Sequence, residues 1–342
     1  MTKLLTIIIP SYNMENYIEN CCRSLLVSFE RQKQLEVLII NDGSKDATSS
    51  LAHAFVEKYP DTFKVIDKEN GNYGSCINIG LKHATGIYVK VLDADDSFFT
   101  ENFEEYIAFL ETAEADLILS DLVAVDSNGM CISETHYDFI PKERMDIAQL
   151  PTTIVSNFRM HAVAYKTKNI QRLGYVQSEG ISYTDEEWIF YPMSAVSTYV
   201  YFNKPVYRYL VGRNGQTTDP QVHAKHMWME LMVTNKMIDA YYYHADTIPD
   251  KNRPYLDAKL ISRCHVMYAF FLVVYRKENR TAAAEEACIS FDKKLQETFP
   301  VIYEKLNAYT YCKVFRFIAA WRKTYDFNAL SLRLCRLIER IR

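Results

Sequence analysis

The sequence predicts an α/β fold: a mainly parallel sheet with helices on both faces, followed by a helical C-terminal region. Three observations support this prediction. Apolar runs alternate with helical patterns four times within about the first 100 residues, as in a doubly wound sheet. After that point strand and helix patterns mix. From about residue 220 onward only helical periodicity remains.

The predicted strands of the first part are short, continuous apolar runs of the kind that parallel sheets bury on both faces. They cover Leu4–Ile9, Glu36–Ile40, Phe63–Asp67 and Ile87–Leu92. Apolar residues at helical spacing indicate the helices between them. These cover Glu15–Phe29, Ala47–Lys58 and a segment from the 68–74 loop to about His83.

The second part adds elements of both kinds to the same domain. Ser127-Asn128-Gly129 predicts a hairpin turn. Helices are expected at Phe103–Thr112, Lys168–Leu173 and Thr184–Val196, and strands at Asp116–Ser120, Ala162–Tyr165, Thr198–Phe202 and Val206–Leu210. The turn formers of GRNGQTTDP indicate a boundary, so we expect one domain over residues 1–217 and a helical domain over 218–342.

Composition narrows the class of protein. The 342 residues carry a net charge of −4, with 49% hydrophobic and 24% charged residues, which is typical of a soluble globular protein and not of a nucleic-acid binder. The eight cysteines form no CxxC pair, which favours reduced thiols in the cytoplasm. No apolar run approaches the roughly 20 residues that a bilayer span needs, and Leu4–Ile9 lacks the features of a signal peptide.

Three carboxylates, Asp93, Asp95 and Asp96, follow the predicted strand at 87–92. Like charges this close oppose one another's ionisation. A hard divalent cation with oxygen ligands removes that cost, and ligands of open α/β sheets bind beyond the carboxyl ends of the strands. The pattern predicts a metal and ligand site. An acidic turn that caps the next helix is the alternative.

Polar residues also follow the other predicted strands, at Ser11–Asn13, Asn41–Ser44 and in the 68–78 loop. The ends of parallel strands meet at one edge of a sheet, so these residues are expected to line a common crevice. Gly71 and Gly74 would let the backbone approach a ligand there. They do not form a GxGxxG dinucleotide fingerprint.

Several of these segments together resemble a known family. TIIIPSYN, VLIINDGSKDAT and GNYGSCINIGLKHATGIYVKVLDADD are similar to the donor-binding half of the family 2 glycosyltransferases, over roughly residues 4–125. SYTDEEWIFYP resembles the acidic helix start that carries the catalytic base in that family. The resemblance implies the GT-A fold, a Rossmann-like mixed sheet, and an inverting transferase of the bacterial polysaccharide-biosynthesis type.

The chain departs from the family pattern in two places. Asn41 stands where the family usually has the first Asp of DDGS. Cys76 and Ile77 stand where it usually has an Ala-Arg pair, so one expected polar contact is missing. The last 120 or so residues carry no resemblance that we can use.

The resemblance implies a nucleotide-sugar donor, with UDP as its nucleotide. Asp42 would accept a hydrogen bond from uracil and Asp93 would face the ribose. The donor contacts expected together are Pro10, Tyr12, Asn13, Asp42, Gly71, Asn78, Asp93 and Ala94. The alternatives are an Asx turn or helix cap for Asp42 and an ordinary helix-surface side chain for Asn78.

The same resemblance implies roles in the reaction. Asp95 would bind Mg²⁺ or Mn²⁺, which neutralises charge on the leaving diphosphate. Asp185 would be the general base for an acceptor hydroxyl, with Glu186 as the fallback. The alternative for both acids is the ordinary preference for carboxylates in a first helical turn.

Two further regions offer weaker expectations. His161, Arg213 and Gln216 are candidates for contacts to the acceptor or a phosphate, against a structural histidine and a solvated loop. Residues 311–342 hold eight Lys or Arg and an amphipathic pattern that suits the inner face of an anionic membrane. The alternative is a helix packed on its own domain. Membrane contact would suit a lipid-linked saccharide acceptor.

Two other functions fit part of the pattern. A metal-dependent nucleotidyltransferase also needs an aspartate-bound metal, but it leaves the carboxylates of 184–188 without a role. A non-catalytic nucleotide-sugar-binding protein would bind the donor without turnover.

Overall fold

The computed structural model describes residues 2–213, 220–274, 281–311, 313 and 315–341. The chain divides into two compact units: residues 1–150 with 157–229, and residues 151–156 with 230–342. The boundary expected between 217 and 218 falls in a segment, 214–219, that lies outside the described residues.

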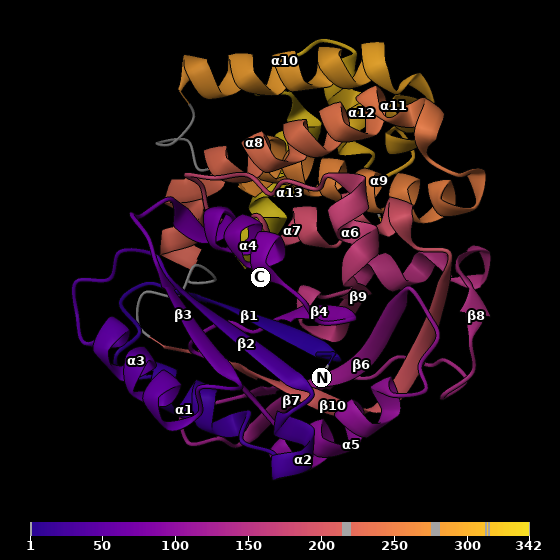
Figure 1. Ribbon diagram of the computed structural model, residues 1–342. Helices are drawn as coiled ribbons and strands as arrows, with labels where there is room; N and C mark the ends of the chain where they lie inside the picture. Colours follow the sequence, from indigo (N-terminus) through magenta and orange to yellow (C-terminus); the bar gives the residue numbers. More distant parts are fainter. Residues whose placement is uncertain (1, 214–219, 275–280, 312, 314, 342) are drawn as a thin grey trace. The chain divides into compact units, whose positions relative to one another are not determined.

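The first unit is built on a mixed ten-stranded sheet (Figure 1). Its main path runs β3-β2-β1-β4-β9-β6-β10-β5, with β7 beside β6 and β8 beside β10. The strands are β1 Leu5–Ser11, β2 Leu35–Asn41, β3 Phe63–Asp67, β4 Tyr88–Val91, β5 Ser97–Phe98, β6 Leu117–Val125, β7 Cys131–Thr135, β8 Met145–Asp146, β9 Val163–Lys166 and β10 Thr198–Leu210. The first four strands of the path are parallel, and β9 runs antiparallel between β4 and β6.

Helices cover both faces of this sheet, as the alternating pattern predicts. Every residue of β1, β2 and β4 is buried, which explains their continuous apolar runs. Figure 1 shows α4 and α6 on one side of the sheet and α1, α2, α3 and α5 on the other. These helices are α1 Ile18–Ser24, α2 Phe29–Gln32, α3 Thr48–Lys58, α4 Asn72–His83, α5 Thr100–Leu110 and α6 Thr167–Leu173.

Three predicted elements differ from the structure. The helix expected over Glu15–Phe29 is the shorter α1 Ile18–Ser24, and a separate helix, α2, begins at Phe29. The helix expected over 184–196 is a short helix, α7 Asp185–Trp188, followed by a 3-10 turn, η4 Tyr191–Ala195. Pro192 has no N–H to continue an α-helix from α7, which explains the break. The two strands expected near 198–210 are one strand, β10, whose register shifts on both sides of Pro205.

The second unit is helical. Its elements are most of α8 Pro220–Tyr243, then α9 Arg253–Ala269, η7 Phe270–Val274, α10 Ala282–Thr298, α11 Pro300–Leu306, α12 Phe317–Arg322 and α13 Leu330–Ile341. The segment η7 is a π-helical turn. The other 3-10 turns among the described residues are η1 Ile147–Gln149, η2 Thr152–Ser156, η3 Met160–Ala162, η5 Ala245–Thr247 and η6 Asp250–Asn252. Among the described residues, no helix is long and apolar enough to cross a membrane.

A buried carboxylate organises the core of the second unit. Asp292 is fully buried and accepts hydrogen bonds from the Tyr268 hydroxyl at 2.6 Å, Arg322 Nε at 2.8 Å and the Tyr325 hydroxyl at 2.9 Å. A buried charge is tolerated when it is paired and its lone pairs are used, as here.

Candidate active site

The loops after β1 and β2 are tied to each other at one edge of the sheet. Pro10 lies within β1, in register with Ile40, and the partly exposed Tyr12 follows the strand. Asn13 adopts a positive φ of 54°, and its N–H donates to Ser44 Oγ at 3.0 Å. The Lys45 N–H donates back to Asn13 Oδ1 at 2.8 Å. These bonds hold the two loops side by side at the strand ends.

Asp42 shapes the next loop along this edge. Its carboxylate is buried and accepts the N–H groups of Gly71 and Asn72, each at 2.9 Å, and the Lys68 ammonium at 2.5 Å. Hence Asp42 holds the 68–72 segment against the end of β2. A Cβ on Gly74 would lie 1.9 Å from the Ser178 carbonyl oxygen, so this glycine permits close packing inside the protein.

Asn78 joins α4 to the loop that precedes α7. Its Nδ2 donates to the Gln177 carbonyl at 2.9 Å and to Glu179 Oε1 at 2.8 Å. Its Oδ1 accepts the Gln177 N–H at 2.8 Å. Both ends of the amide are therefore used within the protein, and they connect the predicted donor half to the segment that carries the predicted base.

Two tyrosines hold the acidic cluster Asp93–Asp96 in place. Asp93 Oδ1 accepts the Tyr73 hydroxyl at 2.7 Å, and the Asp93 N–H donates to the Tyr207 oxygen at 3.0 Å. Tyr207 in turn donates to Asp96 Oδ2 at 2.7 Å, and the Leu210 N–H donates to Asp96 Oδ1 at 2.7 Å. Burial, and then the charges of Asp95 and Asp93, raise the pKa of Asp96 well above its usual value.

Asp95 is paired with an arginine. Arg213 Nε forms an ion pair with Asp95 Oδ2, and the Asp95 side chain is 11% exposed. Burial and the neighbouring Asp93 raise the pKa of Asp95, while Arg213 opposes that shift. The structure thus brings the predicted metal ligand and a predicted phosphate contact together, whereas Gln216 lies outside the described residues.

A second set of ligand atoms lies beside this pair. Oxygen atoms of Asp93 and Asp96 and a ring nitrogen of His161 all lie within 4.8 Å of one another. His161 Nε2 is 3.7 Å from Asp93 Oδ2, and its ring lies 4.6 and 4.9 Å from the rings of Tyr207 and Tyr209. The buried His161 Nδ1 has no hydrogen-bond partner among the described residues. Two carboxylates and an imidazole fit Mn²⁺, and the carboxylates alone fit Mg²⁺.

Asp185 of α7 lies in the neighbourhood of this cluster. The charges of Asp93, Asp185 and Asp96 all add to burial in raising the pKa of the Tyr73 hydroxyl well above its usual value. The Tyr73 hydroxyl, which bonds to Asp93, therefore also lies within electrostatic range of Asp185, the predicted base. Asp185 and Glu186 are partly exposed.

Glu187, the third acid of the same helix, has a structural role. It is buried and accepts the Ser178 N–H at 2.8 Å and the Ser178 hydroxyl at 2.6 Å. This pairing fixes the loop before α7. Only the other two acids of the motif stay candidates for proton transfer.

Three residues at this site were not predicted from the sequence: Tyr73, Tyr207 and the buried Lys90. Tyr73 follows the GN of GNYG, so its place at a strand-end loop could have drawn notice. Tyr207 and Lys90 lie inside strand patterns, where nothing in the sequence distinguishes them from packing residues.

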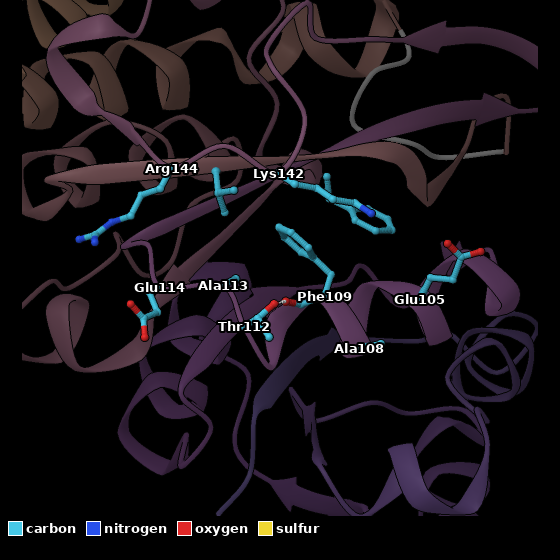
Figure 2. Close-up of a pocket in the computed structure, with 10 residues that line it drawn as sticks. Glu105, Ala108, Phe109, Thr112, Ala113, Glu114, Lys142 and Arg144 are labelled. Atoms are coloured by element: carbon cyan, nitrogen blue, oxygen red, sulfur yellow. Dashed lines mark hydrogen bonds between the residues drawn. The ribbon is translucent and has the colours of Figure 1, made fainter.

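A cavity of about 590 Å³ lies elsewhere in the first unit, between α5 and β10 (Figure 2). Figure 2 shows Phe109 facing Lys142 across it, with Arg144 and Glu114 near one end and Glu105 at the other. It shares no lining residue with the acidic cluster. The convergence of carboxylates, tyrosines and an arginine at the strand ends is the stronger indication of an active site.

Comparisons with known proteins bear on this site. Residues 6–160 match the model of the family described as glycosyl transferase family 2. The uncharacterized glycosyltransferase MG025 of Mycoplasma genitalium is 41% identical over 108 residues, which are 31% of this chain and 36% of that protein. The uncharacterized glycosyltransferase RP339 of Rickettsia prowazekii is 30% identical over 211 residues, 59% of this chain and 62% of that protein. The chain thus spans about one third to two thirds of the length of these curated relatives.

Another relative and two solved structures extend the comparison. The minor teichoic acid biosynthesis protein GgaB of Bacillus subtilis is 29% identical over 120 residues, 35% of this chain and 13% of that protein. S. aureus TarS 1–349, solved with UDP-GlcNAc, has a TM-score of 0.70 at 19% identity and covers 99% of this chain and 92% of its own. The mannosyltransferase PcManGT from Pyrobaculum calidifontis, solved with GDP-Man and Mn²⁺, has a TM-score of 0.52 at 15% identity, covering 98% and 88%. At these identities the two structures show a shared fold. Residues 6–160 of this chain are thus similar to glycosyl transferase family 2, and the first unit has the GT-A fold.

Proposed function

We propose that the protein is an inverting, metal-dependent glycosyltransferase. It would move a sugar from a UDP-sugar to a hydroxyl of a saccharide or lipid-linked acceptor in cell-surface polysaccharide synthesis. The observation that carries this proposal is the cluster Asp93, Asp95 and Asp96 at the end of β4, held by the Tyr73 and Tyr207 hydroxyls and paired with Arg213. TarS with its UDP-GlcNAc and GgaB with its teichoic acid pathway support the donor and the product class.

The donor would lie along the edge formed by the strand ends. Pro10, Tyr12 and Asn13 would border the nucleotide, with Asp42 and the Gly71 backbone near the base. Asp93 and Ala94 would face the ribose. The bonds that Asp42 makes to the 68–72 loop support this, because a carboxylate oxygen can accept a further hydrogen bond while it holds the loop.

Asp95 would hold Mg²⁺ or Mn²⁺, and Arg213 would then leave Asp95 and turn toward a phosphate. Bound there, the cation would neutralise charge on the diphosphate as the bond to sugar C1 breaks. His161 lies close enough to Asp93 to contribute a ligand or a phosphate contact. The pairing of Arg213 with Asp95 supports this exchange, since guanidinium groups also bind phosphate well.

Asp185 would act as general base, with Glu186 as the fallback. It would take the proton from the acceptor hydroxyl while that oxygen forms its bond to C1, opposite the leaving UDP. One displacement at C1 inverts the configuration, through an oxocarbenium-like transition state. Glu187 is excluded from this role because Ser178 already binds both of its oxygens.

The helix α13 would contact an anionic membrane surface, and its exposed side chains support this. Leu330, Leu334 and Leu337 recur at helical spacing on α13 and are exposed. Leu332 and Cys335 are buried, so the helix packs through another face. Successive helical residues are about 100° apart, which places the exposed Arg333 beside the leucine stripe.

Arg336 differs from Arg333 in its contacts. It donates to the carbonyl oxygens of Leu272 and Phe327 at 2.9 and 2.7 Å. It therefore anchors α13 to its own unit. The membrane-facing charge would come from Arg333 and the exposed Lys323.

Release of UDP from UDP-sugars in the presence of Mn²⁺ tests the proposed activity. Asp185→Asn and Asp95→Ala are expected to abolish the release, whereas Glu57→Gln, an exposed acid of α3, is expected to leave it unchanged. Pyrophosphate release from a nucleoside triphosphate would instead identify a nucleotidyltransferase. Donor binding without turnover, unaffected by Asp185→Asn, would identify a non-catalytic binding protein.

A further inference from the structure

A lysine lies buried in β4, directly before the acidic cluster. Lys90 is 0% exposed and precedes Asp93 by three positions. Burial lowers the pKa of Lys90 to about 7. An ammonium in such a place is costly unless polar groups surround it, so its partners indicate why the chain keeps it there.

The partners of Lys90 are two carbonyls, one in η3 and one in the first residue of β9. Its Nζ donates to the His161 oxygen at 2.6 Å and to the Val163 oxygen at 3.3 Å. The described ladder between β4 and β9 consists of the pairs Tyr88–Lys166 and Val89–Tyr165. Lys90 therefore joins the two segments beyond the last registered pair, on the side toward the acidic cluster.

Two neighbours of Lys90, His161 and Tyr207, also contact the acidic cluster. His161, held through its carbonyl, places its ring 3.7 Å from Asp93. The ammonium also lies 5.9 Å from the ring centroid of Tyr207, whose hydroxyl bonds to Asp93 and Asp96. One buried lysine thus lies against His161 and Tyr207, the two side chains that contact these carboxylates.

We propose that Lys90 is a positioning residue that sets the place of the His161 ring against Asp93. Partners behind a ligand or catalytic group fix its orientation, and their loss displaces it without removing it. For catalysis the proposal rests on the proposed transferase function. The placement of His161 can be tested without it.

Three variants separate positioning from folding. Lys90→Met keeps the length of the side chain and removes the donors, whereas Lys90→Gln keeps an amide donor. Tyr88→Phe is the control: it removes a buried hydroxyl from the same strand, whose bonds go to the Ala113 and Ala115 carbonyls and not to His161.

The first measurement is the NMR signal of the His161 ring in the ligand-free protein, identified by its absence in His161→Gln. The signal is expected to shift in Lys90→Met, to shift less in Lys90→Gln and to stay in place in Tyr88→Phe. An unmoved signal in Lys90→Met overturns the proposal. So does loss of folding in both Lys90 variants, because the lysine would then serve the whole fold.

The second measurement is the rate of UDP release. Lys90→Met is expected to lower kcat on the order of 10²-fold, the effect of a small misplacement of a catalytic group. Adding His161→Gln to Lys90→Met should cost less than adding it to the unchanged chain, since both changes disturb one contact. If the loss of kcat in the double variant equals the product of the two single losses, the proposal is overturned. If the unchanged protein releases no UDP, the transferase function fails while the NMR result still decides the role of Lys90.

Discussion

At the scale of single residues, Glu36 shows how buried charge supports the fold. It lies in β2, 1% exposed, and accepts bonds from Thr6 Oγ1 at 2.8 Å, Lys64 Nζ at 2.9 Å and the Thr85 N–H at 2.8 Å. Burial alone would raise the pKa of this carboxyl, but the three partners together hold its pKa below the usual value. The ionised form is therefore the one that the folded state favours.

Glu36→Gln is expected to lower the free energy of unfolding at pH 7 by about 1–3 kcal/mol, because buried partners lose a charged acceptor. A lowered folded-state pKa gives stability above the unfolded value, near 4.3, and that stability is lost as pH falls through the folded pKa. The variant should therefore lose less stability than the unchanged protein between about pH 5 and pH 3. Urea unfolding across that range measures both effects, with Glu57→Gln as the control. Equal acid slopes for the two proteins would contradict the assignment.

The roles of buried charged residues such as Glu36 could not be predicted from the sequence. The aspartates after β4 could be predicted as a site because three adjacent carboxylates are costly without a ligand. Glu36 and Lys90 lie inside apolar runs. Their partners come from β1, β3, the loop before β4, η3 and the start of β9. Partners so distant in sequence cannot be inferred from periodicity, so neither role was predicted.

At the scale of elements, α13 shows what an amphipathic pattern can predict. It predicts that apolar residues share one face of a helix, but not which face packs against the rest of the protein. An amphipathic pattern was predicted over residues 311–342, whereas the burial of Leu332 and Cys335 and the bonds of Arg336 to its own unit depend on neighbouring elements. The length of α7 could not be predicted from the pattern either. The helix that begins at Asp185 ends at Trp188, because Pro192 cannot continue it.

Binding of the protein to anionic vesicles is expected to need the leucine stripe. Leu334→Asp and Leu337→Asp should each weaken co-sedimentation with phosphatidylglycerol vesicles by about tenfold or more, since burying one leucine contributes roughly 1.5–3 kcal/mol. Both residues are exposed, so thermal stability should change little. Val301→Asp, an exposed apolar residue of α11, is the control. Equal binding by all four proteins would exclude the stripe as a lipid contact.

At the scale of the whole molecule, the sequence predicted the mixed sheet, its helical cover and the edge where the strand ends meet, because each follows from local periodicity and connection rules. It did not predict that Pro151–Ser156 belong to the second compact unit, since such an excursion has no local signal. Nor did it show how the predicted donor half of the first unit is joined to the segment that carries Asp185. That connection is made by Asn78.

Asn78→Ala tests this connection between the two halves of the first unit. If Asn78 serves mainly to fasten α4 to the 177–179 loop, the variant should lower kcat by about tenfold or more while the affinity for UDP stays within about twofold, because the displaced group is the base and not the donor pocket. Asn70→Ala is the matched contrast, since Asn70 Nδ2 donates to the Asp42 carbonyl at 3.0 Å in the predicted donor loop. That variant should weaken UDP binding and leave kcat nearly unchanged. Calorimetric UDP affinities and initial rates of UDP release measure the two effects. A loss of UDP affinity in Asn78→Ala, with kcat intact, would instead identify Asn78 as the donor contact that the family resemblance implies.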